Sequence, residues 1–238
     1  VLFALLPAAA FLYASVGHGG ASSYLMFMAL FNFAPAPTRV TALALNIVVS
    51  LLAYLSYRRT CVFPWKLFAA LVLFSIPAAF LGGNIQIDTL WYKRILGLLL
   101  LFPILRFLNL FPQAVEARVG QRWWMLPLIG TAIGFVSGLI GIGGGIILSP
   151  VLLMLGWTNI RETAALSALF IFVNSIAGLA GANPLGVAIQ PELWALMPPT
   201  VAAGALGAWY GAQKFNVATV RYLLTSVLAL AAVKLMLA

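Results

Sequence analysis

Long apolar runs, separated by short polar stretches, make up nearly the whole chain. Taken in order, they predict helical segments at 1–16, 23–33, 38–57, 63–85, 90–110, 123–139, 146–155, 163–182, 193–212 and 217–237. Crossing the hydrocarbon core of a bilayer takes about 20 apolar residues. Segments 23–33 and 146–155 are too short for this, and each follows directly after a cluster of glycines.

The two glycine clusters are Gly17-His18-Gly19-Gly20 and Gly141-Ile142-Gly143-Gly144-Gly145, 124 positions apart (141 − 17). Each glycine costs a helix roughly 1 kcal/mol relative to alanine, and in lipid an unwound backbone must find partners inside the protein. One interpretation is a close helix crossing, which glycine permits. The pattern favours another, in which the break faces a protein-lined cavity and free N–H groups at a helix start hold an anion.

Similar spacings beyond the glycines predict an internal repeat. Ser50 corresponds to Asn174 at a spacing of 124, and Leu81-Gly82 to Leu206-Gly207 at 125. Arg39 and Arg161 stand at equivalent helix starts, 122 positions apart. We therefore expect a first transmembrane repeat at 1–112, a linker at 113–121 and a second transmembrane repeat at 122–238.

Composition identifies the class of protein. Of the 238 residues, 64% are hydrophobic and 7% are charged, whereas soluble domains carry about 25% charged residues. This indicates an all-α polytopic membrane protein, and the opening run, which lacks a basic leader, is expected to be its first span. The net charge of +9 does not indicate nucleic-acid binding, because the basic residues are scattered between apolar runs. Cys61 is the only cysteine, which excludes an intrachain disulfide and a Cys/His metal site.

The basic residues also predict the number of crossings, because they prefer the cytoplasmic side. If the segments around each glycine cluster form a hairpin, each repeat has five segments and the basic residues split nine to four. One side then holds Arg58, Arg59, Lys66, Arg106, Arg118, Arg122, Arg161, Lys214 and Arg221, and the other Arg39, Lys93, Arg94 and Lys234. Treating each broken pair as one crossing splits them seven to six. The hairpin arrangement is favoured, and it predicts two inverted-topology repeats, both termini outside, and the 58–66 and 111–122 loops in the cytoplasm.

The motif Gly141-Ile142-Gly143-Gly144-Gly145 with Ser149-Pro150, and its degenerate copy at Gly17–Gly20, resemble the TauE/SafE family of membrane permeases. The resemblance covers nearly the whole chain, and its most specific part is the glycine motif with Pro150. It implies transport of sulfite, sulfonates such as sulfoacetate, and related small organic anions across the bacterial inner membrane. The first copy departs from the pattern, since His18 and Ala21 stand where the second has Ile142 and Gly145, and Met26 stands opposite Pro150.

The candidate site combines the glycine clusters with polar residues inside apolar helices. His18 is a candidate for anion binding or proton coupling, because imidazoles titrate near pH 6.5; helix capping is its alternative. For Ser22 and Ser23 the alternative role is helix capping. For the polar residues inside the long helices the alternative role is ordinary interhelical hydrogen bonding. Arg39 and Arg161 are expected to serve as loop or lipid-headgroup residues rather than anion ligands. The expected substrate-binding residues are Gly17, His18, Gly19, Gly20, Ser22, Ser23, Asn46, Ser50, Gly141, Gly143, Gly144, Gly145, Ser149, Ser167 and Asn174.

We expect a secondary transporter of small organosulfur anions, with the substrate held near the midplane between the two glycine breaks. An anion channel or a small-carboxylate permease would use the same donors, and a membrane-embedded enzyme or an assembly subunit is a third class. The sequence has no Walker motif and no Ser/His/Asp or paired-carboxylate arrangement, which argues against an enzyme. The expected partners are a small anionic substrate and the lipid bilayer, without cofactor, metal or nucleic acid; a homodimer is left open.

Overall fold

The apolar runs form helices throughout the part of the chain that the structure, a computed structural model, describes: residues 1–107, 122–182, 186 and 191–214. No strand occurs among these residues. The first half holds α1 (Leu2–Ala14), α2 (Ala21–Leu30), α3 (Pro35–Tyr57), α4 (Trp65–Gly83) and α5 (Thr89–Phe107). The second half holds α6 (Met125–Ile140), α7 (Gly145–Met154), α8 (Ile160–Ala182), α9 (Pro191–Trp194) and α10 (Met197–Lys214). The predicted linker 113–121 and the predicted segment 217–237 lie outside the described residues.

Three described helices are long and apolar enough to cross a membrane: α3, α4 and α8. The shorter helices α1, α2, α6 and α7 are apolar as well. Each pair of short helices meets at one glycine cluster, as the apolar pattern predicts. The fold is therefore that of an all-helical membrane protein.

Prolines set two helix starts differently from the prediction. The third predicted segment starts at residue 38, but α3 begins three residues earlier, at Pro35. Proline fits the first turn of a helix, where its missing N–H has no intrahelical acceptor. Likewise, Pro198 and Pro199 lie in the first turn of α10, so the predicted segment 193–212 divides into α9 and α10.

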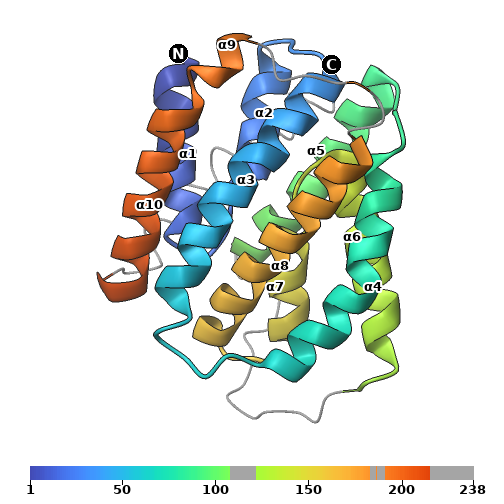
Figure 1. The fold of residues 1–238 in the computed structure, drawn as a ribbon, viewed down its shortest axis with the longest axis vertical. Coiled ribbons are helices and arrows are strands. Elements are labelled where there is room, and N and C mark those ends of the chain that lie inside the picture. The colour runs from blue at the N-terminus through green and yellow to red at the C-terminus, as the bar shows by residue number, and fades with distance from the viewer. Residues whose placement is uncertain (108–121, 183–185, 187–190, 215–238) are drawn as a thin grey trace.

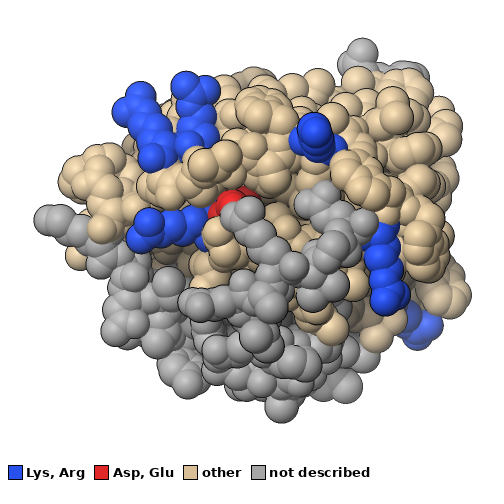
Figure 2. Space-filling model, turned by 90° about the horizontal axis from the view of Figure 1, so that it is seen from below, with Lys and Arg blue, Asp and Glu red and all other residues tan. Residues whose placement is uncertain are grey.

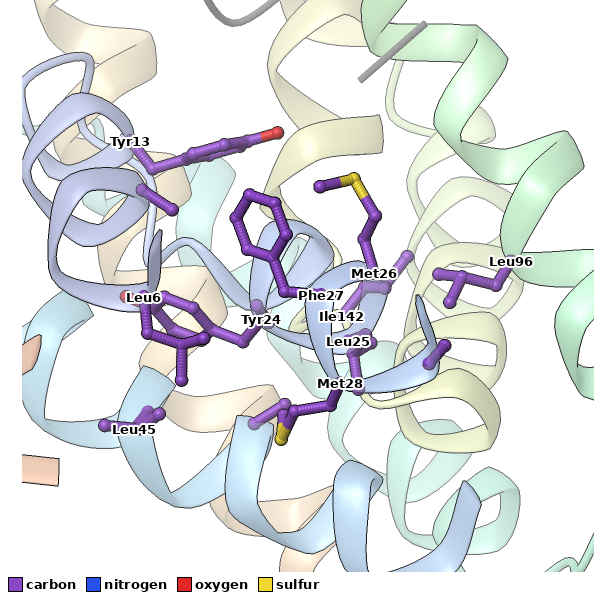
Figure 3. Close-up of a cluster of buried hydrophobic side chains, with 14 of the residues drawn as sticks. Leu6, Tyr13, Tyr24, Leu25, Met26, Phe27, Met28, Leu45, Leu96 and Ile142 are labelled. Atoms are coloured by element: carbon purple, nitrogen blue, oxygen red, sulfur yellow. The ribbon is translucent and has the colours of Figure 1, made fainter. Parts of the chain in front are cut away.

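The long helices α3 and α8 cross the middle of the molecule side by side and run in opposite directions (Figure 1). The outer pairs join the two halves of the chain: α4 packs along α6, and α10 packs along α1. Every residue of α2 from Ala21 to Ala29 is buried. Figure 3 shows its side chains pointing toward α1 at Leu6 and Tyr13, toward Leu45 of α3 and toward Leu96 of α5. A helix that is apolar all round is expected in such a central position.

Small residues let the outer helix pairs approach closely. On α6, Gly130, Gly134 and Gly138 recur every fourth residue and lie against the carbonyls of Leu71, Ser75 and Ala79 of α4. On α10, Gly207 and Gly211 lie in the same way against the carbonyls of Phe11 in α1 and of Ser15, which caps the end of α1. Glycines at a spacing of four are the usual device for backbone contact between helices in lipid.

A side chain at these crossings should separate α4 from α6. In Gly138→Leu the new Cβ would overlap the Ala79 carbonyl, which belongs to helix backbone and cannot turn aside. Overpacking costs about 1–3 kcal/mol, so the unfolding midpoint of the detergent-solubilised protein should fall by about 2–12 °C. Ala132→Leu, on the exposed side of the same helix, is the matched control and should change it little. Equal midpoints for the two variants would contradict the close crossing.

Candidate functional site

The backbone at both breaks adopts a conformation that favours glycine. Gly17 and Gly20 have φ of 80° and 89°, and Gly141 and Gly144, each 124 positions later, have φ of 90° and 78°. Gly143 adds a fifth positive φ, at 74°. L residues with a side chain rarely adopt this region, so the glycines are required by backbone conformation as well as by packing.

The short helices α2 and α7 begin in the same way. Gly20 and Gly144 are the N-caps, and the first intrahelical bonds run to their carbonyls from Ser23 and Tyr24 in α2 and from Ile147 and Leu148 in α7. The amides just before these donors lie outside the helical ladder, as at any helix N-terminus. Both breaks therefore present backbone N–H groups that need acceptors from elsewhere.

Asn46 and Ile171 contact both breaks. Each is the twelfth residue of a 23-residue helix, Asn46 of α3 and Ile171 of α8. A Cβ at Gly19 would meet both side chains, and one at Gly143 would lie 2.6 Å from Asn46 Nδ2 and 2.7 Å from Ile171 Cγ2. Asn46 also bridges the breaks, because its Oδ1 accepts from the Ala21 amide (3.1 Å) and its Nδ2 donates to the Ile142 carbonyl (3.4 Å). The two predicted glycine clusters thus come together around one buried amide side chain.

Hydroxyls of three tyrosines bind carbonyls at or near the breaks. Tyr24 donates to Gly19 (2.9 Å), Tyr92 to Ile140 (3.0 Å) and Tyr57 to Ser15 (2.6 Å). Each carbonyl lies at the end of a broken helix or in the break itself. These bonds satisfy acceptors that would otherwise be costly to bury.

A chain of polar side chains leads from the first break to α7 and α8. His18 Nε2 lies 2.9 Å from Ser149 Oγ, and Ser149 Oγ lies 2.8 Å from Ser167 Oγ. His18 Nδ1 lies 3.0 Å from the Val16 carbonyl, and Ser149 Oγ also lies 2.9 Å from the Gly145 carbonyl. Four of the predicted substrate-binding residues are therefore close neighbours: His18, Gly145, Ser149 and Ser167.

The Ser149 hydroxyl has one proton and three neighbours, so its bonding depends on the charge of His18. Because the Val16 carbonyl can only accept, Nδ1 of His18 donates to it, and in the neutral imidazole Nε2 is then an acceptor. Ser149 donates to Nε2 in that state. In the protonated imidazole Nε2 donates instead, and the Ser149 proton is released toward Ser167 or Gly145. Protonation of His18 would thus reverse the hydrogen bond between His18 and Ser149.

The other predicted residues occupy several positions. Ser22 and Ser23 are buried in the first turn of α2. Ser50 donates to the Asn46 carbonyl, and Asn174 donates to the Phe170 carbonyl at 2.9 Å, so both bond within their own helices. Since α3 and α8 begin 125 residues apart (160 − 35), Ser50 is level with Ser175 rather than with the predicted Asn174.

Ser175 and Ser137 lie beside the second break and were not among the predicted substrate-binding residues. A Cβ at Gly143 would lie 3.1 Å from Ser175 Oγ, and a Cβ at Gly144 would lie 3.3 Å from Ser137 Cβ. Both side chains are fully buried, and both hydroxyls lack a hydrogen-bond partner among the described residues. A repeat alignment that used the helix starts would have found Ser175, and the position one turn before the glycine break would have pointed to Ser137.

Arg39 contradicts its prediction. It was expected to be a loop or lipid-headgroup residue, but only 4% of it is exposed. The misplaced start of α3 caused the error, because the helix begins one turn earlier and carries Arg39 inward. Arg161, its predicted counterpart, is exposed at the start of α8. The buried residue level with Arg39 is instead Ala164, which packs on Gly17 as Arg39 packs on Gly141.

Comparison with known proteins agrees with this membrane fold. The family model described as sulfite exporter TauE/SafE matches residues 2–235. A relative from Sinorhizobium fredii (strain NBRC 101917 / NGR234), described as probable membrane transporter protein y4hK, is 32% identical over 228 residues, which cover 94% of this chain and 92% of the relative. No solved structure matches the chain. The chain belongs to the TauE/SafE family of membrane transporter proteins.

Proposed function

We propose that this protein is a secondary transporter that moves small organosulfur anions, such as sulfite, sulfoacetate or other sulfonates, across the bacterial inner membrane. The observation that carries the proposal is the convergence of two positive-φ glycine breaks on Asn46 and Ile171. Helix N-termini directed at a buried point suit an anion. The substrate class rests on the family description, which names sulfite.

The neutral donors around the breaks support an oxyanion rather than a cation. Ser137 and Ser175 have buried hydroxyls without a partner among the described residues, and they lie against Gly144 and Gly143. An unbonded buried hydroxyl costs about 1–3 kcal/mol. A bound anion would accept hydrogen bonds from these hydroxyls and from the amides that begin α7.

An inverted-topology repeat is part of the proposal. Four features support it. The helices α2 and α7 have equal lengths, as do α3 and α8, and matching glycines have positive φ. The helices α3 and α8 run in opposite directions (Figure 1), and each half packs an outer helix on the other half, α4 on α6 and α10 on α1. One contact repeats in detail, since Gly82 lies on the carbonyl of Phe135 and Gly207 on that of Phe11. Both spacings are near 124 (207 − 82 = 125 and 135 − 11 = 124). In such transporters the halves rock around a site near the midplane.

Charge supports the orientation that we propose, with the end shown in Figure 2 toward the cytoplasm. Basic side chains lie around this face (Figure 2). The α3–α4 loop that reaches it carries Arg58 and Arg59, and Lys66 lies in the first turn of α4. Cys61 of this loop contacts the Arg161 carbonyl at 3.7 Å, which brings a further basic residue to the same end. Lys93 and Arg94, in the first turns of α5, lie at the other end and fit the rule least well.

Accessibility of single cysteines should reveal the orientation. In a Cys61→Ser background, Val62→Cys should react with an impermeant maleimide only from the cytoplasmic side, and Gln86→Cys only from outside. Both positions are exposed, whereas burial and the nearby Glu162 raise the pKa of the native Cys61 thiol and slow its reaction. Labelling of Val62→Cys from outside, or of both positions from one side, would contradict the proposed topology.

Transport should depend on the bare backbone of the second break. Gly144→Val should abolish sulfite uptake into proteoliposomes, because a Cβ would lie 2.9 Å from both Ile133 and Phe170 and valine resists a φ of 78°. Gly156→Val is the matched control, since it places the same residue at a positive φ outside the breaks.

A milder variant separates binding from folding at the same place. Ser175→Ala removes one hydroxyl and no backbone freedom, so it should raise KM for sulfite about tenfold, the loss of one charge-assisted hydrogen bond. The anion site would be contradicted if correctly inserted Gly144→Val protein showed undiminished uptake and Ser175→Ala showed an unchanged KM. The second glycine break would then serve only helix packing. Saturable counterflow in the wild type would support a transporter, and ohmic current would favour an anion channel.

The pH dependence of uptake should identify the role of His18. His18→Gln keeps a hydrogen-bonding group beside Ser149 but cannot titrate, so the dependence of uptake on pH between about 5.5 and 7.5 should flatten while anion binding survives. Uptake is measured against external pH in proteoliposomes of both proteins. Superimposable normalised profiles, with only a lower unfolding midpoint in the variant, would leave His18 as a helix cap.

A further inference from the structure

Arg39 is a buried cation held by the ends of two helices. Its Nη1 donates to the carbonyls of Ile85 (2.8 Å) and Leu139 (3.1 Å), and its Nη2 donates to the Gly83 carbonyl (2.9 Å). Gly83 ends α4, and Leu139 lies in the last turn of α6. The negative ends of two helix dipoles therefore face the guanidinium and offset part of the cost of burying it.

The charge of Arg39 is not neutralised by any described side chain. Its hydrogen bonds all go to carbonyls, and Nε has no partner among the described residues. The nearest carboxylate along the chain is Asp88, which is exposed and accepts a bond from the Leu90 amide at 2.8 Å without pairing with Arg39. A full positive charge set against three partial negative charges attracts an anion.

A cleft leads to this charge. It has a volume of about 140 Å³ and is lined by Arg39 and Tyr92 inside and by Ala36, Gln86 and Thr89 toward the surface. This volume holds several water molecules or one small oxyanion. Gln86 and Thr89 are exposed, so the cleft reaches the surface at the end of the molecule opposite the Arg58–Lys66 loop.

The cleft adjoins the second glycine break. A Cβ at Gly141 would lie 2.6 Å from Arg39 Cγ, and Tyr92 holds the Ile140 carbonyl next to it. A guanidinium has five N–H donors, and the bonds to the carbonyls of Ile85, Leu139 and Gly83 use three of them, so donors remain for an anion. The guanidinium can then hold an anion and the end of α6 at the same time.

We propose that this cleft is a second anion site, in which Arg39 takes up a small oxyanion before it reaches the glycine breaks or after it leaves them. The substrate identity rests on the proposed function, but the anion chemistry rests on Arg39 and the cleft alone. A phospholipid phosphate has the same chemistry, and the arms of the test below distinguish it from a free anion.

The decisive variant is Ala36→Trp, which fills the cleft and touches none of the Arg39 hydrogen bonds. It should raise KM for sulfite about tenfold with little change in kcat. It should also reduce the sulfite-induced rise in unfolding midpoint of delipidated protein in detergent, leaving only the part that comes from binding at the glycine breaks. Arg39→Gln should raise KM at least as much. Arg39→Lys keeps the positive charge but loses the planar set of guanidinium donors, so its KM should lie between those of the wild type and Arg39→Gln. Arg161→Gln removes an exposed charge at the start of α8 and should match the wild type.

The outcomes separate this proposal from the transport function. A wild-type KM and a wild-type thermal shift in Ala36→Trp would overturn the cleft site and leave Arg39 as a clamp, with the proposed transport intact. If the wild type transports no organosulfur anion, but sulfite, phosphate or acetate still stabilises it and Ala36→Trp abolishes the effect, the site holds and the transport function fails. Stabilisation by phosphatidylglycerol alone, lost in Ala36→Trp, would overturn the proposal in favour of a lipid headgroup site.

Discussion

The chain interrupts two helical segments inside its own buried core, where backbone groups must find partners without bulk water. The requirement is met from outside the breaks: Asn46 bonds the Ala21 amide and the Ile142 carbonyl, Tyr24 bonds the Gly19 carbonyl, and Arg39 and Tyr92 bond the end of α6. Most of these side chains come from helices that pack on the breaks. The positions of α3 and α5 are therefore tied to the conformation of the glycines, so that a change in one break must be felt by the long helices.

In the inverted repeat that we propose, the two halves have similar backbones, and the side chains at matching positions differ. Asn46 is level with Ile171, and Arg39 with Ala164, so both the bridging amide and the buried charge come from the first half alone. His18, opposite Ile142 in the repeat, adds a titratable ring to the first break. A transporter built from two similar halves needs similar backbones to exchange its two open forms. Polar groups that are present in only one half give the two open forms of such a transporter different free energies.

The sequence predicted the helical membrane fold and both glycine breaks, because apolar runs and glycine clusters act locally. It could not place Arg39, since the boundary between Pro35 and Thr38 decides whether that residue lies at a loop or one turn inside a helix. The sequence named His18, Ser149 and Ser167 as candidates but could not predict that they contact one another. His18 and Ser149 are 131 positions apart in the chain and come together only through tertiary packing. Ser175 was left out of the expected site because the predicted repeat paired Ser50 with Asn174, whereas the starts of α3 and α8 pair it with Ser175.

For the transport function that we propose, the distribution of charge suits the passage of an anion better than its retention. The groups at the breaks are amides, hydroxyls and one imidazole, so an anion there would be held by hydrogen bonds of moderate strength. The full positive charge of Arg39 lies to one side, beside Gly141, and is already shared among three carbonyls. A permeant ion must be attracted strongly enough to lose its water and weakly enough to leave again. Separating the attracting charge from the hydrogen-bonding groups satisfies both demands, because neither place alone offers the anion a charge and a complete set of donors.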